Sequence, residues 1–223
     1  MPVSKPAFIF DMDGVLVDTP GHNWRAIRQT LVPYGVVIDD EEVKLYLGRP
    51  LDKQFADIAE HHQLDLTFEN FLQQHGETIA RLEREQPLET VIGLRAFLEA
   101  ARDQGIKMGV GTSSLTPRAE RLLNLVGIRD FFDAIVGAED VPEHKPNPHI
   151  FLEVARRLHK DVAKCVVFED AANGVEAARR GGFKVIGLAS AFQSPVDLAD
   201  PNLVVRDFTE LDVNRCAEIV NAR

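Results

Sequence analysis

Cysteine is scarce in this chain, with only Cys165 and Cys216 among its 223 residues. Two cysteines are too few for a disulfide framework or for a cysteine-rich zinc site. Cys165 opens a short apolar run at 165–168. We therefore expect its thiol to be buried and unreactive.

Basic residues are also few compared with acidic ones. The chain has 25 Lys and Arg against 35 Asp and Glu, which gives a formal net charge of −10. Nucleic acids and anionic membranes are bound through clustered cations, so this balance argues against both as partners. No apolar stretch approaches the roughly 18 residues of a membrane span, and the N-terminus does not resemble a signal peptide. We expect a cytoplasmic monomer.

Short apolar runs alternate with helical patterns through most of the chain. Six runs of this kind lie at 7–10, 108–111, 134–136, 165–168, 184–188 and 203–205. Most are apolar at consecutive positions, which is typical of parallel strands buried on both faces. Apolar residues at helical spacing predict helices at 94–104, 117–126, 148–158 and 171–180. The alternation predicts an α/β core, a Rossmann-like doubly wound parallel sheet.

Residues 18–87 break this rhythm because they contain no comparable strand. Their pattern predicts consecutive helices at 23–32, 40–47, 51–62 and 67–84. Pro20-Gly21 and Gln86-Pro87 mark the expected hinges. We therefore expect a discontinuous α/β core domain interrupted by an all-helical cap domain, with the core at 1–17 and 88–223 and the cap at 18–87.

Polar residues follow several apolar runs, at the end of the sheet where parallel strands bind ligands. They comprise four carboxylates, two hydroxyls and one ammonium group: Asp11, Asp13, Glu169, Asp170, Thr112, Ser113 and Lys145. Carboxylates that face one another repel, and a divalent cation removes that repulsion. Mg²⁺ prefers oxygen ligands and commonly binds one or two carboxylates together with a substrate phosphate. The sequence therefore predicts a magnesium site at this edge.

Four motifs in this order resemble those of the haloacid dehalogenase superfamily of phosphotransferases. They are FIFDMDGVLVDT at 8–19, VGTSS at 110–114, Lys145-Pro146, and VFED at 167–170 followed by Gly174. The helical insertion resembles the small cap of the branch that contains phosphoglycolate phosphatase and beta-phosphoglucomutase. The resemblance covers nearly the whole chain.

The resemblance implies catalytic and metal-binding roles. Asp11 would be the nucleophile that forms an aspartyl-phosphate, and Asp13 would be the general acid and base. Lys145 would offset the negative charge of the nucleophile and the phosphate. Mg²⁺ would be bound by Asp11, Asp170, the main-chain carbonyl of Asp13, and Glu169 either directly or through water.

The resemblance implies phosphate and substrate contacts as well. Thr112 and Ser113 would hold the phosphoryl oxygens with a hydroxyl and main-chain N–H groups. Asn23 and Arg49 are candidates to contact a small phosphorylated metabolite from the cap, and solvated surface positions are the alternative for both.

A phosphatase that hydrolyses a small phosphate monoester, such as a sugar phosphate or phosphoglycolate, is the main expectation. Asp13 argues against a dehalogenase, because the release of halide needs no general acid. A beta-phosphoglucomutase-like enzyme is the alternative. Such mutases have a histidine at the position of Asn23 and a Gly-Val-Ser-Arg-like run where this chain has Gly48-Arg49. A non-catalytic regulator that binds a phosphorylated ligand is a third interpretation, but every motif residue is intact.

Two features of the insertion are expected to be structural. Trp24 shares a helical spacing with Ile27 and Leu31, which predicts a place in the core of the cap. The adjacent pair His61-His62 lacks the i, i+4 spacing and the third ligand that a transition-metal site needs. We expect both histidines to be exposed to solvent.

Overall fold

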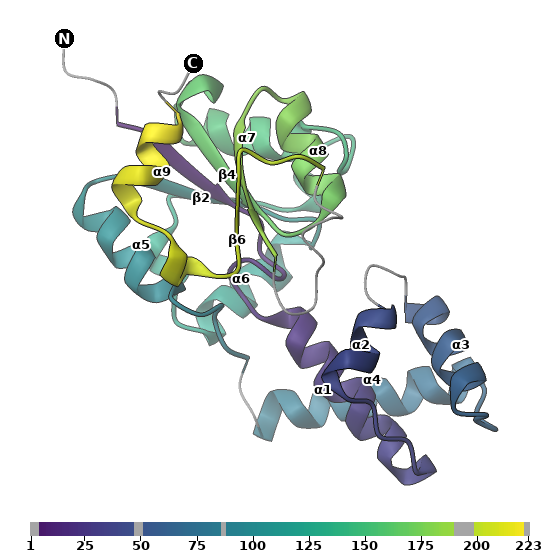
Figure 1. Cartoon of the computed structure of the whole chain (residues 1–223). Helices are drawn as coiled ribbons and strands as arrows, with labels where there is room; N and C mark the ends of the chain where they lie inside the picture. The colour runs from purple at the N-terminus through teal and green to yellow at the C-terminus, as the bar shows by residue number, and fades with distance from the viewer. Residues whose placement is uncertain (1–4, 47–50, 86–87, 190–198, 221–223) are drawn as a thin grey trace. The chain divides into compact units, whose positions relative to one another are not determined.

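The computed structural model describes residues 5–46, 51–85, 88–189 and 199–220. The chain divides into two compact units (Figure 1). The first, called the core unit below, comprises Met1–Asp18 and Glu89–Arg223. The second, called the helical unit, comprises Thr19–Leu88.

The core unit is built on a parallel sheet. Its strands are β1 (Ala7–Phe10), β2 (Lys107–Gly111), β3 (Ala134–Val136), β4 (Cys165–Glu169), β5 (Lys184–Leu188) and β6 (Leu203–Val205). Their order in the sheet is β3-β2-β1-β4-β5-β6, and every neighbouring pair is parallel. The Rossmann-like doubly wound sheet predicted from the sequence is therefore confirmed.

Helices cover both faces of this sheet (Figure 1). They are α5 (Leu94–Asp103), α6 (Thr116–Leu125), α7 (His149–Arg157), α8 (Ala172–Arg180) and α9 (Val213–Ile219). In Figure 1, α5 and α9 lie on one side of the strands, and α7 and α8 lie on the other. Helix α9 was not expected from the apolar pattern. The Asp212 side chain caps its start by accepting hydrogen bonds from the main-chain N–H groups of Asn214 and Arg215.

Aromatic rings fill one face of the sheet. Phe8, Phe10 and Phe168 alternate with smaller residues along β1 and β4, so their side chains share a face. The rings of Phe10 and Phe168 stack with centroids 4.6 Å apart, and Phe8 stacks on Phe97 of α5 at 5.7 Å. Phe208 closes the cluster, 5.2 Å from Phe97.

Smaller aliphatic residues fill the opposite face. Ala7, Ile9 and Val167 are fully buried there and belong to one cluster with Val154 of α7 and Val175 of α8. Because both faces are covered, the strands can be apolar at every position, which explains the uninterrupted runs in the sequence.

The helical unit consists of α1 (Thr19–Leu31), the 3₁₀ turn η1 (Val32–Tyr34), α2 (Asp40–Tyr46), α3 (Leu51–His61) and α4 (Phe68–Glu85). Trp24 is buried and stacks on Tyr46 with ring centroids 6.2 Å apart. Its predicted place in a hydrophobic core is therefore confirmed.

The hinge expected at Pro20-Gly21 stays a prediction, and the boundary between the two units lies close to it, between Asp18 and Thr19. Helix α1 begins at Thr19, so both residues lie in its first turn. Proline is tolerated there because the first N–H groups of a helix have no partner within the helix. The other expected hinge, Gln86-Pro87, lies outside the described residues.

Both cysteines are buried, as expected for Cys165, and burial raises the pKa of each thiol to about 12. Among the residues that the structure describes, no helix is long and apolar enough to cross a membrane.

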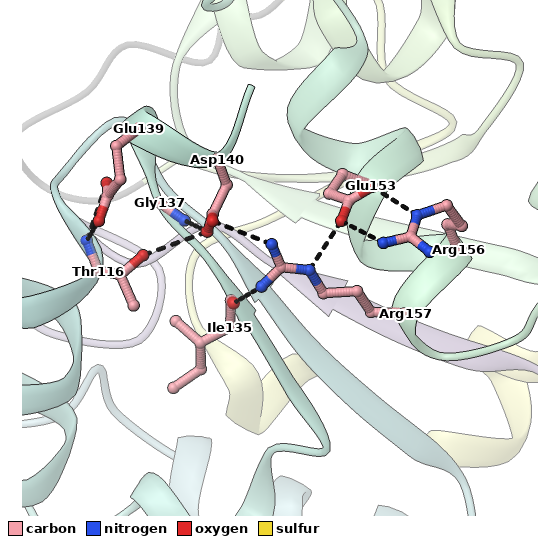
Figure 2. Close-up of polar contacts among 8 residues, drawn as sticks. All are labelled: Thr116, Ile135, Gly137, Glu139, Asp140, Glu153, Arg156 and Arg157. Carbon is pink, nitrogen blue, oxygen red and sulfur yellow. Dashed lines mark hydrogen bonds and ion pairs between the residues drawn. The ribbon is translucent and has the colours of Figure 1, made fainter. Parts of the chain in front are cut away.

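A polar network joins the end of β3 to the start of α6 and the end of α7 (Figure 2). Asp140 accepts hydrogen bonds from the N–H of Gly137 at 3.0 Å and from the hydroxyl of Thr116 at 3.3 Å. Arg157 pairs with Asp140 at 3.0 Å and donates to the carbonyl of Ile135 at 2.9 Å. The network therefore fixes the segment after β3 relative to the loop after β2.

Asp140→Asn is expected to lower the free energy of unfolding by roughly 1–2 kcal/mol near pH 7. Burial alone would raise the pKa of Asp140, but the Gly137 N–H and Arg157 hold that pKa below its usual range. A lowered pKa in the folded state gives stability above the ordinary pKa of aspartate, and this stability is lost as the pH falls through the lowered value. Urea denaturation at about pH 7 and about pH 2.5 measures the difference.

The matched control is Asp103→Asn, because Asp103 is exposed at the end of α5. Its stability should stay within about 0.5 kcal/mol of the wild-type value at both pH values. An equal loss for Asp140→Asn at both pH values would contradict the electrostatic role of this carboxylate.

Candidate active site

Three neighbouring strands end at the same level of the sheet. Phe10, the last residue of β1, pairs with Val110 of β2 and with Phe168 of β4. The chain leaves β1 first toward β2 and β3, and it later returns to the other side of β1 as β4. Ligands of open α/β sheets bind beyond the carboxyl ends of the strands at such a switch point. The residues after β1 and β2 and at the end of β4 therefore face one region.

Lys145 lies between two carboxylates in this region. Its ammonium donates to Asp11 Oδ1 and to Glu169 Oε1, the latter at 2.7 Å. The side chains of Lys145, Asp11 and Glu169 are only 5%, 10% and 2% exposed. The main-chain N–H of Ala171 donates to the other oxygen of Glu169 at 2.7 Å. We call Asp11, Lys145 and Glu169 the buried triad.

Two glycines make room for the carboxylates of Glu169, at the end of β4, and of Asp170, which follows it. A Cβ atom on Gly14, which has a φ of 84°, would lie 2.0 Å from Asp170 Oδ2. A Cβ atom on Gly174 would lie 1.7 Å from Glu169 Oε1. Neither distance is compatible with a side chain, so Asp170 rests against the turn after β1 and Glu169 rests against α8.

Burial and mutual repulsion act on the ionisation of these groups. Burial raises the pKa of Asp11 to about 7, opposed by Lys145 and reinforced by Glu169. Burial also raises the pKa of Asp170 well above its usual value, and Glu169 and Asp11 add to this effect. Burial would lower the pKa of Lys145, but the two carboxylates of the triad raise it overall, so its ammonium stays charged.

One ammonium faces three buried carboxylates here, so negative charge is in excess. A further cation would relieve it, and the donors on offer are oxygens only. Such a set suits Mg²⁺, which favours oxygen ligands, and does not suit a metal that prefers nitrogen or sulfur. The buried acidic residues Asp11, Glu169 and Asp170 therefore fit a magnesium ion.

Asp13 has a more open environment than Asp11. Its side chain is 35% exposed and accepts a hydrogen bond from the Ser114 hydroxyl at 3.2 Å. Arg118 of α6 donates to both of its carboxylate oxygens, at 3.1 and 3.2 Å, and also to the Ser114 hydroxyl. Thr112 is buried, and its hydroxyl oxygen accepts a hydrogen bond from the Ser114 N–H at 3.1 Å.

The structure thus brings most of the expected site residues together, and Arg118 is an addition to them. Ser113 is exposed in the loop after β2. Asn23 belongs to the helical unit, where its side-chain oxygen lies 3.0 Å from Nε2 of His75. Arg49 lies outside the described residues. A signal for Arg118 was present, because Thr116-Pro117 marks a helix start directly after a strand-end motif.

Comparison with known proteins identifies the family. The family model for haloacid dehalogenase-like hydrolases matches residues 8–188. The chain is 36% identical to the fructose-1-phosphate phosphatase YqaB of Escherichia coli over 180 residues, which cover 80% of this chain and 93% of that protein. It is 35% identical to a phosphorylated carbohydrates phosphatase of Thermotoga maritima over 182 residues, 81% of this chain and 83% of that protein.

A solved structure of similar extent is that of a beta-phosphoglucomutase from Clostridium difficile. It matches with a TM-score of 0.65 and 27% identity, and the match covers 98% of both chains. The chain belongs to the haloacid dehalogenase-like hydrolases, so the family expected from the four motifs is confirmed. Both relatives named above are phosphatases, enzymes that hydrolyse phosphoric monoesters.

Gly174→Ala tests the close packing of Glu169 against α8. Alanine in a helix is usually about 1 kcal/mol more stable than glycine. Here the added methyl group would collide with Glu169, so we expect a loss of about 1–3 kcal/mol in the free energy of unfolding, measured by urea denaturation.

Gly76→Ala is the matched control, because a Cβ atom on Gly76 of α4 would meet no atom within 4 Å. That variant should be more stable than the wild type by up to about 1 kcal/mol. If both variants gained the same stability, Glu169 would not be packed against Gly174.

Proposed function

We propose that the protein is a Mg²⁺-dependent phosphatase that hydrolyses a small phosphate monoester through an aspartyl-phosphate intermediate. The observation that carries this proposal is the buried triad beside Asp170, at the carboxyl ends of β1 and β4. A carboxylate held by an ammonium, next to acidic oxygen donors, suits attack on a phosphoryl group whose charge must also be offset.

Asp11 is the proposed nucleophile. Its ionised carboxylate attacks phosphorus, and the bond between phosphorus and the leaving oxygen breaks. Lys145 touches Asp11 directly, so its ammonium favours the ionised form of the carboxylate and is proposed to lie near the incoming phosphate. Neighbouring Glu169 fixes the position of that ammonium.

Asp13 is the proposed general acid and base. Its partial exposure lets it give a proton to the departing alkoxide and then take one from the water that hydrolyses the aspartyl-phosphate. Arg118 and Ser114 hold both carboxylate oxygens, so they set the direction in which this group points. We propose that Arg118 acts as a positioning residue for Asp13.

Residues of the same site are proposed to hold the metal and the phosphate. Asp11, Asp170, Glu169 and the carbonyl of Asp13 would hold Mg²⁺, which would draw the phosphate and the nucleophile together by offsetting their charges. The Thr112 hydroxyl oxygen already accepts a hydrogen bond, so its proton is available to a phosphoryl oxygen. Ser113 is proposed to offer a hydroxyl and a main-chain N–H to the same group.

Phosphorylated carbohydrates are the proposed substrate class, because the relatives of highest identity described above act on them by name. The helical unit is proposed to serve as the cap that selects the substrate and excludes water. Asn23 and Arg49 remain proposals for contact with the sugar. The net charge of −10 favours a small metabolite over a polyanion as the ligand. We further propose that the protein acts in the cytoplasm and as a monomer.

A phosphosugar mutase is the second candidate function. The beta-phosphoglucomutase structure that covers 98% of both chains favours it. The two activities share the aspartyl-phosphate and differ in whether water or a second sugar hydroxyl accepts the phosphoryl group. The acceptor is therefore what an experiment must identify.

Asp11→Asn is expected to lower phosphate release by at least about 1,000-fold, because an amide cannot attack phosphorus as a carboxylate does. Release of inorganic phosphate from fructose 1-phosphate and from an aryl phosphate, with excess Mg²⁺, measures this. Asp103→Asn should retain the wild-type rate, and circular dichroism of both variants checks the fold.

Turnover by Asp11→Asn at the wild-type rate would refute the nucleophile. Removal of Mg²⁺ by a chelator should abolish activity, and the return of Mg²⁺ should restore it.

Incubation with beta-glucose 1-phosphate and a trace of the corresponding bisphosphate distinguishes the phosphatase from the mutase. Rapid formation of glucose 6-phosphate without release of phosphate would favour the mutase.

Arg118→Ala is expected to lower kcat by roughly tenfold with a smaller change in KM, because Asp13 loses the partner that orients it. Arg156→Ala is the matched control, because Arg156 is exposed and pairs with Glu153 on its own helix. The two kinetic constants for aryl phosphate hydrolysis provide the measurement. An increase in KM alone would assign Arg118 to substrate binding instead.

A further inference from the structure

A second cluster of metal-ligating side chains lies in the helical unit. It consists of Glu42 on α2, His61 at the end of α3, and His62 directly after it. One ligand atom from each residue lies within 4.8 Å of the other two. Nε2 of His62 is 2.6 Å from Glu42 Oε1, and the rings of the two histidines are 4.8 Å apart at 71°.

The third ligand expected to be missing near His61-His62 is therefore present. Glu42 precedes His62 by 20 residues, so no local spacing could reveal it. Helix α3 ends at His61, and Gln63 takes a φ of 52°, so the chain turns directly after the pair. Successive side chains on a helix point about 100° apart, and the departure from the helix lets both rings approach one carboxylate.

Glu42 is held in place by a second residue. The hydroxyl of buried Tyr46 donates to Glu42 Oε1 at 2.8 Å, and Tyr46 is itself fixed by stacking on Trp24. Carboxylates that bind metals are typically oriented by such outer hydrogen bonds. A ligand can reach this cluster from solvent, because His61 is exposed. Glu42 and His62 are partly buried, with 15% and 21% of their side chains exposed.

We propose that Glu42, His61 and His62 form a binding site for a transition-metal ion of the Zn²⁺ class, made of different residues from the acidic site in the core unit. Two imidazoles and one carboxylate are a ligand set that Zn²⁺ uses, with water at the fourth position. Mg²⁺ prefers oxygen ligands and would favour the core unit instead.

The three side chains need to move only slightly to bind a metal ion. Ligand atoms about 2.1 Å from a tetrahedral ion lie about 3.4 Å apart. The Glu42–His62 pair must therefore open from 2.6 Å, and the widest pair must close from at most 4.8 Å. His61 is exposed and can turn. The proton between Glu42 and His62 is then carried by the other ring nitrogen of the neutral imidazole or is lost to solvent.

The consequence of metal binding is a bridge between α2 and the end of α3. An ion that binds the folded helical unit and not the unfolded chain raises its stability by mass action. The site thus couples metal availability to the rigidity of these two helices.

Co²⁺ titration of the full-length protein in excess Mg²⁺ tests the proposal. The excess Mg²⁺ keeps Co²⁺ away from the site whose ligands are all oxygens. Four-coordinate Co²⁺ bound to imidazoles absorbs visible light far more strongly than six-coordinate Co²⁺ bound to oxygens. We expect one equivalent of Co²⁺ to give this strong absorption and Zn²⁺ to abolish it. Glu42→Gln and His61→Ala should each weaken binding by roughly tenfold or more.

His159→Asn is the matched control, because His159 is exposed and its φ of 55° is tolerated by asparagine. It should bind Co²⁺ as the wild type does, and Asp170→Asn should keep the strong absorption. His61→Ala is the decisive variant, because its exposed position makes misfolding a poor explanation. Wild-type affinity in that variant, or the absence of strong absorption in the wild type, would overturn the proposal.

Discussion

The candidate active site depends on the ion pairs that the ammonium of Lys145 makes with two buried carboxylates. This ammonium is the buried cation between Asp11 and Glu169, and without it two carboxylates at neighbouring strand ends would face each other across a dry interior. Removal of one partner from a buried ion pair strongly destabilises the folded protein, because the remaining charge is buried without an opposite charge. The sheet brings the carboxylates together, and the segment after β3 must deliver the lysine to them. The polar network around Asp140 fixes that segment at its start.

Much of this arrangement could be predicted from local sequence. Strands buried on both faces leave uninterrupted apolar runs, and polar residues at their carboxyl ends must share one edge of a parallel sheet. That rule alone places Asp11, Thr112 and Glu169 together, although 158 positions separate the first from the last. The glycines could also be recognised in the sequence as part of the motifs, but the sequence did not show why glycine is needed at these positions. Only the three-dimensional packing shows that Gly14 and Gly174 make room for carboxylates.

The features that escaped prediction depend on contacts between distant segments. Arg118 stands out only when α6 brings it to Asp13, 105 positions away in the chain. The Glu42–His62 contact likewise joins α2 to the turn after α3, and the histidine pair alone has no recognisable metal spacing. In each case the sequence shows the residue, but only the structure shows the group that it contacts.

The two aspartates after β1 show how one short turn can supply two chemical environments. Asp11 directly follows β1 and is buried, and this burial raises its pKa while Lys145 opposes the rise. Asp13 lies beyond it on the open side, in contact with Arg118 and the Ser114 hydroxyl. A nucleophile must stay ionised and shielded from water, whereas an acid and base must exchange protons with a leaving group and with water. The spacing of two residues separates these demands, and Gly14, at a φ of 84°, then turns the chain away so that Asp170 can occupy the space beside them.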